Sequence, residues 1–133
     1  MNTAKLVRDT FKLQTNQPNE PIVKVETIWD CHEGQNKVIF ISGKVTGDPY
    51  YRGKFRLAET NLKAKGYVVL NPAYLPQGLN TAKSMAICLN MLSYADCVYM
   101  LSDWQDSRGA TIEHDFASYS GKEIIYESDE LSN

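Results

Sequence analysis

Four short, mostly apolar segments separated by helical patterns constrain the fold of this chain more than any other sequence feature. The segments are predicted strands, at residues 37–42, 67–73, 97–101 and 123–127. They contain many β-branched and aromatic residues, as expected of strands that are covered on both faces. The intervening patterns predict helices, at residues 51–65, 81–94 and 110–120. Gly66 and Gly121 follow the first and third helices and are expected to end them.

The alternation of strands and helices predicts an α/β fold. Right-handed crossovers between successive strands then give a doubly wound, mostly parallel sheet of four to five strands, of the flavodoxin-like or Rossmann-like kind. Such sheets bind ligands at the carboxyl ends of their strands, where the strand order reverses. Functional residues are therefore expected in three loops, at residues 42–48, 71–78 and 102–110.

Two expectations concern packing rather than chemistry. The inner face of the first helix is predicted to consist of four apolar residues, Phe55, Leu57, Ala58 and Leu62. Asp96 precedes the third strand at its amino end, on the side away from the expected crevice. Its carboxylate is therefore predicted to order that turn instead of taking part in chemistry.

The chain divides into an N-terminal arm or extension, residues 1–36, and one α/β domain, residues 37–133. The arm contains a short amphipathic pattern, Lys5–Leu13, and an alternating segment, VKVET, that is typical of an edge strand. Two interpretations stand for it: a segment that packs on the domain or on a second subunit, and an ordinary N-terminal tail.

Charge and hydropathy exclude several classes of partner. The chain has 14 basic and 16 acidic side chains and a net charge of −2, which disfavours binding to a nucleic-acid polymer. It has no apolar run long enough for a membrane span and no signal-peptide pattern, so we expect a cytoplasmic protein without a membrane partner.

Common cofactor motifs are absent from the sequence. The glycines at 43 and 47 are not followed by a Walker-type lysine, and no G-x-G-x-x-G follows the first strand, which disfavours an ATPase and a dinucleotide enzyme. The three cysteines, Cys31, Cys88 and Cys97, have no C-x-x-C spacing. We therefore expect no metal, no disulfide and no cofactor.

The start of the third helix has the composition of an anion site. Ser107 is a natural N-cap with a hydroxyl donor, Arg108 adds a cation, and Gly109 permits close approach of a ligand to the backbone. Taken alone, these residues favour the simpler interpretation that Ser107 caps the helix and Gly109 fits a turn. Glu113, deeper in the same helix, favours a functional site over a simple cap, because a carboxylate near the crevice can serve as nucleophile or general base. The alternative is a solvated glutamate.

The first loop supplies Ser42, Gly43 and Lys44, which are candidate substrate contacts. Three further cations follow on the first helix, Arg52, Lys54 and Arg56. One or two of these cations facing a phosphate would form a basic rim, and the remainder are expected to lie on a solvated helix face.

The other two loops supply an amide and several aromatic rings. Asn71 ends the second strand, where its amide would read a base or a ribose hydroxyl; a turn-forming role before Pro72 explains it equally well. Trp104, Tyr50 and Tyr74 have the chemistry to stack on a flat ring, although loop aromatics also serve as lids or interface residues.

Four segments together resemble the nucleoside 2-deoxyribosyltransferase-like family, which includes nucleoside 5′-monophosphate N-glycosidases and small phage and bacterial proteins. They are I-F-I-S-G-x-x-T-G, V-x-N-P-A, A-D-C-V-Y-M-L and S-R-G-A-T-I-E, and the match covers roughly residues 37–127. The resemblance implies a homo-oligomer that binds a small-molecule nucleotide.

The resemblance also implies a mechanism. A glutamate, here Glu113, attacks the anomeric carbon of a (deoxy)ribose, and the glycosyl-enzyme intermediate passes to water or to another base. In the family's monophosphate hydrolases a serine six residues before the glutamate helps to hold the 5′-phosphate. Ser107 matches that position, so the resemblance favours a nucleoside monophosphate over a free nucleoside.

One position departs from the family pattern. The family places an acid on the second helix to handle the proton of the base, and Cys88 or Leu89 stands there in this chain. Three alternatives remain: one of three loop acids, Asp48, Asp103 or Asp106, replaces it; the base leaves without that help; or catalysis is lost and the chain is a nucleotide-binding module.

Overall fold

The computed structural model describes residues 34–131, which form an α/β fold as predicted. The strands are β2 (Val38–Ser42), β3 (Val68–Leu70), β4 (Cys97–Met100) and β5 (Glu123–Tyr126). The helices are α2 (Tyr51–Ala64), α3 (Thr81–Ser93), α4 (Arg108–Tyr119) and α5 (Glu127–Leu131), and two 3-10 turns are η3 (Pro72–Tyr74) and η4 (Trp104–Asp106). The predicted helix and edge strand of the N-terminal arm lie outside the described residues, and the domain boundary stays a prediction.

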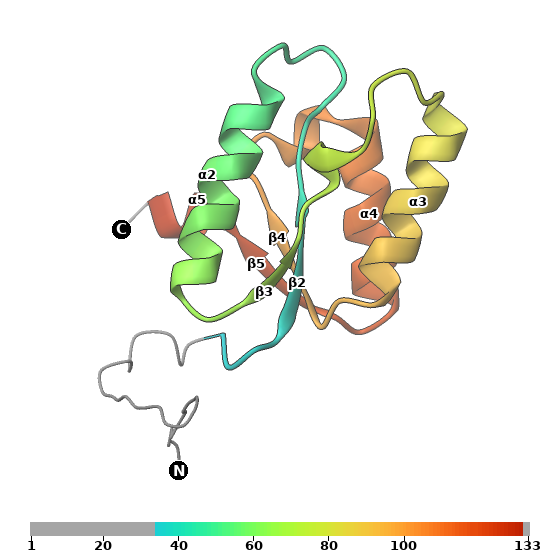
Figure 1. Ribbon diagram of the computed structural model, residues 1–133. Helices are drawn as coiled ribbons and strands as arrows, with labels where there is room; N and C mark the ends of the chain where they lie inside the picture. Colours follow the sequence, from blue (N-terminus) through green and yellow to red (C-terminus); the bar gives the residue numbers. More distant parts are fainter. Residues whose placement is uncertain (1–33, 132–133) are drawn as a thin grey trace, which may run out of the picture. The chain divides into compact units, whose positions relative to one another are not determined.

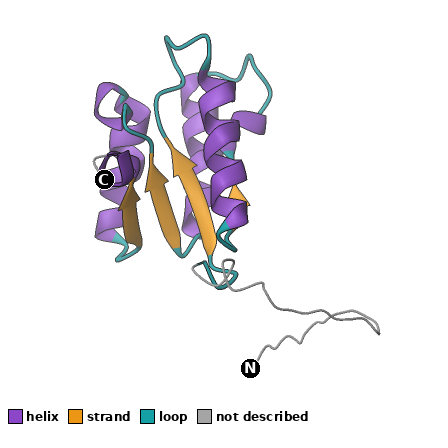
Figure 2. Cartoon of the chain, turned by 90° about the vertical axis from the view of Figure 1, so that its left-hand side faces the viewer, coloured by secondary structure: helices purple, strands orange, loops and turns teal. Residues whose placement is uncertain are grey.

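The four strands form one parallel sheet with the order β3-β2-β4-β5. This is the predicted doubly wound, flavodoxin-like arrangement. Figure 1 shows α2 and α5 on one face of the sheet and α3 and α4 on the other. The chain runs outward from β2 to β3 and then returns to β4, so the strand order reverses between β2 and β4. Figure 2 shows all strands pointing one way, with loops after the arrowheads at one end. The expected ligand crevice lies there.

Alternating side chains of the two central strands form the core on both faces of the sheet. The cluster on the α2 side is Ile39, Ile41, Phe55, Ala58, Leu62, Tyr67, Ala73, Cys97, Tyr99 and Leu101. The cluster on the α3 and α4 side is Phe40, Leu92, Ala95, Val98, Met100, Ala110 and Ala117. Successive residues of a strand point to opposite faces, which explains why an uninterrupted apolar run is needed.

The prediction for the inner face of α2 was wrong at one position. Phe55, Ala58 and Leu62 are buried, but Leu57 is 64% exposed. Two residues correspond to about 200° around a helix, so Leu57 points away from Phe55. Glu59 takes the remaining buried position, because its carboxylate is held by polar partners.

Three element boundaries differ from the predicted ones for local reasons. β3 ends at Leu70 because Asn71 caps η3 with its side chain, which accepts a hydrogen bond from Ala73. α4 begins two residues earlier than predicted, because Ser107 is its N-cap. The last strand ends at Tyr126, and the unpredicted α5 begins at Glu127. Asp96 has the predicted structural role, since its Oδ2 accepts a hydrogen bond from the Val38 amide at 2.9 Å.

Gly43, directly after β2, is a position where a side chain does not fit. A Cβ added there would lie 2.7 Å from Leu101 Cδ1 and 2.9 Å from Leu101 Cβ. Because Leu101 is fully enclosed in the core, we expect Gly43→Ala to destabilise the fold by about 1–3 kcal/mol. Urea denaturation measures this change.

Gly53 provides the matched control for that measurement. It lies within α2 with nothing within 4 Å of an added Cβ, so Gly53→Ala should stabilise the helix by roughly 0.5–1 kcal/mol. Equal urea midpoints for the two alanine variants would contradict the assigned packing of Gly43 against Leu101.

Candidate active site

Glu113 is an acid on the buried face of α4. It shares that face with Ala110 and Ala117, at helical spacing, and is only 6% exposed. Its Oε1 accepts a hydrogen bond from Ser42 Oγ at 2.5 Å. Ser42 is the last residue of β2 and is itself buried. The carboxyl group therefore lies against the carboxyl end of a central strand, where the strand order reverses, and the alternative of a solvated glutamate is excluded.

Two neutral donors flank this carboxyl group. Burial raises the pKa of Glu113 to about 7, and hydrogen bonds from Ser42 and Cys88 partly oppose that rise. Burial, followed by the nearby Glu113 charge, raises the pKa of the Cys88 thiol to about 12. The thiol thus keeps its proton and can donate it in a hydrogen bond. Near neutral pH Glu113 is therefore present in both its protonated and its ionised form, and a carboxyl group with a strongly shifted pKa is a candidate functional group.

The N-terminus of α4 is capped by a side chain, as the simpler interpretation expected. Ser107 Oγ accepts a hydrogen bond from the Ala110 amide at 3.1 Å. Arg108 is exposed at the first position of the helix. A Cβ at Gly109 would lie 3.3 Å from Met85 Cε, so Gly109 permits the close contact of α4 with α3. The hydroxyl proton of Ser107 can still be donated to a ligand while its oxygen caps the helix.

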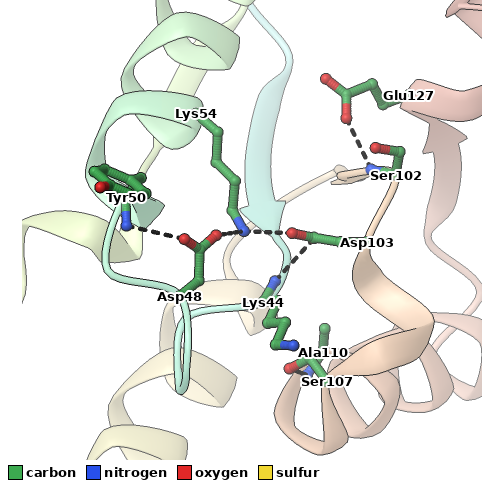
Figure 3. A network of polar contacts seen from close by, with 9 residues as sticks. All are labelled: Lys44, Asp48, Tyr50, Lys54, Ser102, Asp103, Ser107, Ala110 and Glu127. Carbon is green, nitrogen blue, oxygen red and sulfur yellow. Dashed lines mark hydrogen bonds and ion pairs between the residues drawn. The ribbon is translucent and has the colours of Figure 1, made fainter.

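Lys54 joins the loops that follow β2 and β4 (Figure 3). Its ammonium group forms ion pairs with Asp48 Oδ2 at 2.5 Å and with Asp103. The other oxygen of Asp103 accepts a hydrogen bond from the Lys44 amide at 3.1 Å. The hydrogen bond from Lys54 holds the pKa of Asp48 below its usual value. Asp48 is therefore ionised at neutral pH and has no proton to give to a leaving base.

Two candidate binding residues are engaged by other parts of the protein. Asn71 is buried, and its Nδ2 donates to Glu59 Oε1 at 2.8 Å. The Trp104 ring stacks on His114 with 4.2 Å between the ring centroids. His114 Nε2 in turn lies 2.7 Å from the Tyr126 hydroxyl. In this arrangement Asn71 and Trp104 support the loops that surround the site.

Sequence reasoning did not identify three contributions to this site. It named Ser42 as a candidate substrate contact and Lys54 as part of a basic rim, without predicting the partners of either, and it did not name Glu59. A signal existed for Ser42, the one polar residue at the end of an apolar strand, and for Glu59, which falls on the buried helical spacing of Phe55 and Leu62. For Lys54 one partner, Asp48, is six residues away in the sequence, but the other, Asp103, is 49 residues away and gives no local signal.

Residues 37–126 match the family model described as Domain of unknown function (DUF4406). The chain belongs to this family. Its fold is also similar to that of the solved structure "2-desoxiribosyltransferase from Leishmania mexicana", with a TM-score of 0.56 and 18% sequence identity. That match covers 68% of this chain and 63% of the other, so the chain accounts for less than two thirds of the length of that protein.

No curated protein matches the chain. At 18% sequence identity, the likeness to the solved structure shows the α/β fold of the domain alone. Any chemistry has to be inferred from the site residues. Within residues 34–131, no helix has the length and apolar character of a membrane span, and no group of three or more metal-ligating side chains occurs.

Proposed function

We propose that this chain breaks or exchanges the N-glycosidic bond of a (deoxy)nucleoside 5′-monophosphate, with Glu113 as the nucleophile. The observation that carries the proposal is the buried carboxyl group of Glu113, hydrogen-bonded to Ser42 at the point where the strand order reverses. Burying a carboxyl group is costly, so an inward glutamate at a ligand-binding position is better explained by chemistry than by stability. The fold likeness to a deoxyribosyltransferase is consistent with this reaction class.

In the proposed reaction the Glu113 carboxylate attacks the anomeric carbon of the sugar. The bond from that carbon to the base breaks, its electron pair stays on the base, and water supplies the proton that the base takes up. Water or a second base then attacks the glycosyl ester and releases the carboxylate. Hydrogen bonds from Ser42 and Cys88 favour the ionised form of Glu113 and hold it in one orientation.

The 5′-phosphate is assigned to the N-terminus of α4. Backbone amides there carry partial positive charge, Arg108 adds a full charge, and Gly109 adds no side chain of its own. Lys44, whose amide is fixed by Asp103, is a second cation on the neighbouring loop. Ser107 lies six residues before Glu113, so one helix would hold the phosphate and present the nucleophile.

The test is base release from a panel of nucleosides and their 5′-monophosphates, followed by chromatography, with wild-type protein and Ser107→Asp. Aspartate is also a good N-cap, so the variant should fold, but its carboxylate repels a phosphate. We expect at least a tenfold loss in kcat/KM for monophosphates and little change for unphosphorylated nucleosides. Equal losses for both substrate classes would contradict the assigned phosphate position.

A second candidate function is a nucleotide-binding module without turnover. It is favoured by the neutral Cys88 thiol beside Glu113 and by the pairing of Asp48 and Asp103 with Lys54, which leaves the base without an evident proton donor among these side chains. Saturable calorimetric binding of a monophosphate together with no base release across the panel would select this candidate.

A further inference from the structure

Lys54 occupies a central position between the two loops that border the strand reversal. It lies in the first turn of α2 and its side chain is 26% exposed. Its ammonium group meets two carboxylates, one from each loop: Asp48 after β2 and Asp103 after β4. The second oxygen of each carboxylate accepts a hydrogen bond from a backbone amide in the loop after β2. Asp48 accepts from the Tyr50 amide, and Asp103 accepts from the Lys44 amide.

These contacts connect the two halves of the proposed site. Lys44 lies two residues after Ser42, the residue that is hydrogen-bonded to Glu113. Asp103 lies four residues before Ser107, the cap of α4. Figure 3 shows Lys54 between Asp48 and Asp103, and the hydrogen bond from the Lys44 amide to Asp103. A displacement of the loop after β2 would therefore move Ser42 and Lys44 relative to α4, the helix that carries both Glu113 and the proposed phosphate site.

The charges make the network dependent on the lysine. Burial disfavours the charged form of Lys54, but its hydrogen bonds to Asp103 and Asp48 outweigh this and raise its pKa. Without the ammonium group, two carboxylates would face each other across the loops and would also oppose an approaching phosphate. Asp48 and Asp103 would then repel each other, and solvent and salt screen the repulsion between partly buried charges only in part.

We propose that Lys54 is a positioning residue that fixes the relative placement of these two loops and thereby sets the affinity of the site for a phosphorylated ligand. The inference rests on the proposed function for the identity of the ligand. The link between the loops depends only on the contacts of Lys54.

The experiment compares Lys54→Met, Lys54→Arg and the control Arg56→Met, which removes a cation from an exposed position of the same helix. Amide hydrogen exchange at Lys44 and Tyr50 is followed by NMR. Calorimetry measures dissociation constants for a nucleoside monophosphate and for inorganic phosphate, and kcat and KM are measured where turnover occurs.

We expect Lys54→Met to speed exchange of the Lys44 amide at least tenfold and to raise the dissociation constant or KM for the monophosphate by about tenfold, with kcat within twofold. Lys54→Arg should restore part of both losses, and Arg56→Met should change neither. A purely structural lysine would instead lower the unfolding midpoint and leave affinity unchanged in the folded fraction.

Unchanged exchange at Lys44 in Lys54→Met would overturn the inference, as would faster exchange with unchanged affinity. Failure of the proposed function has a different signature, because wild-type protein would then release no base from any member of the panel. In that case exchange and the calorimetric constants still decide the role of Lys54.

Discussion

Glu113→Gln is expected to lower base release from the preferred nucleoside monophosphate by about a thousandfold or more, because an amide cannot form the glycosyl ester. Glutamine has almost the same shape as a protonated glutamate and can still accept the hydrogen bond from Ser42. Substrate affinity should therefore change little, and the loss should appear in kcat. Chromatographic assay of free base over hours, at saturating monophosphate, measures it.

Asp115→Asn is the matched control, since it removes the same charge from an exposed side chain of the same helix. It should retain base release within about twofold, as exposed substitutions away from a site usually have small effects. Base release by Glu113→Gln within tenfold of wild type would exclude Glu113 as the nucleophile. Mass spectrometry of wild-type protein quenched during turnover adds a direct readout, the mass of one sugar phosphate on the peptide that contains residue 113.

Glu113→Gln should also make the protein more stable than wild type above neutral pH, by on the order of 3 kcal/mol at pH 8. The reference pKa of a glutamate carboxyl is 4.5, and burial raises that of Glu113 to about 7. Between these values the folded chain binds more protons at this site than the unfolded chain, so wild-type stability falls as pH rises from about 4.5 to about 7 and stays reduced above it. Glutamine does not ionise and removes this fall.

Urea denaturation of wild type and Glu113→Gln at pH 4 to 8 measures the effect, and the difference between the two curves isolates this one group. The two proteins should have similar unfolding free energies near pH 4, diverge between about pH 4.5 and about pH 7, and differ by a nearly constant amount above that range. A difference that is constant with pH would show that Glu113 ionises normally in the folded state. The control Asp115→Asn should follow the wild-type curve.

The order of elements could be predicted from the sequence because each signal is local. Apolar runs such as residues 37–42 and 97–101 mark buried strands, and Gly66 and Gly121, both with positive φ, end helices where expected. Leu57 was misplaced because an apolar residue was taken for an inward one, although its helical angle points outward. The helix α5 was missed because its acidic residues are ordered by distant partners, as when Tyr99 donates to Glu130.

The site could be predicted in part for the same reason. The loops at the strand ends and the spacing of Ser107 and Glu113 are visible in the sequence. The hydrogen bond between Ser42 and Glu113 joins residues 71 positions apart, so it depends on how α4 docks on the sheet. The orientation of Asn71 and Trp104 likewise depends on Glu59 and His114, which belong to other elements.

The two outer strands of the described sheet are short, with three residues in β3 and four in β5. A brief edge offers a neighbouring chain few unpaired backbone groups, which is one way in which proteins avoid cross-chain strand addition and amyloid-like growth. Two copies of this domain would therefore gain few hydrogen bonds by pairing these outer strands. Contacts between copies are expected to use helical surfaces instead.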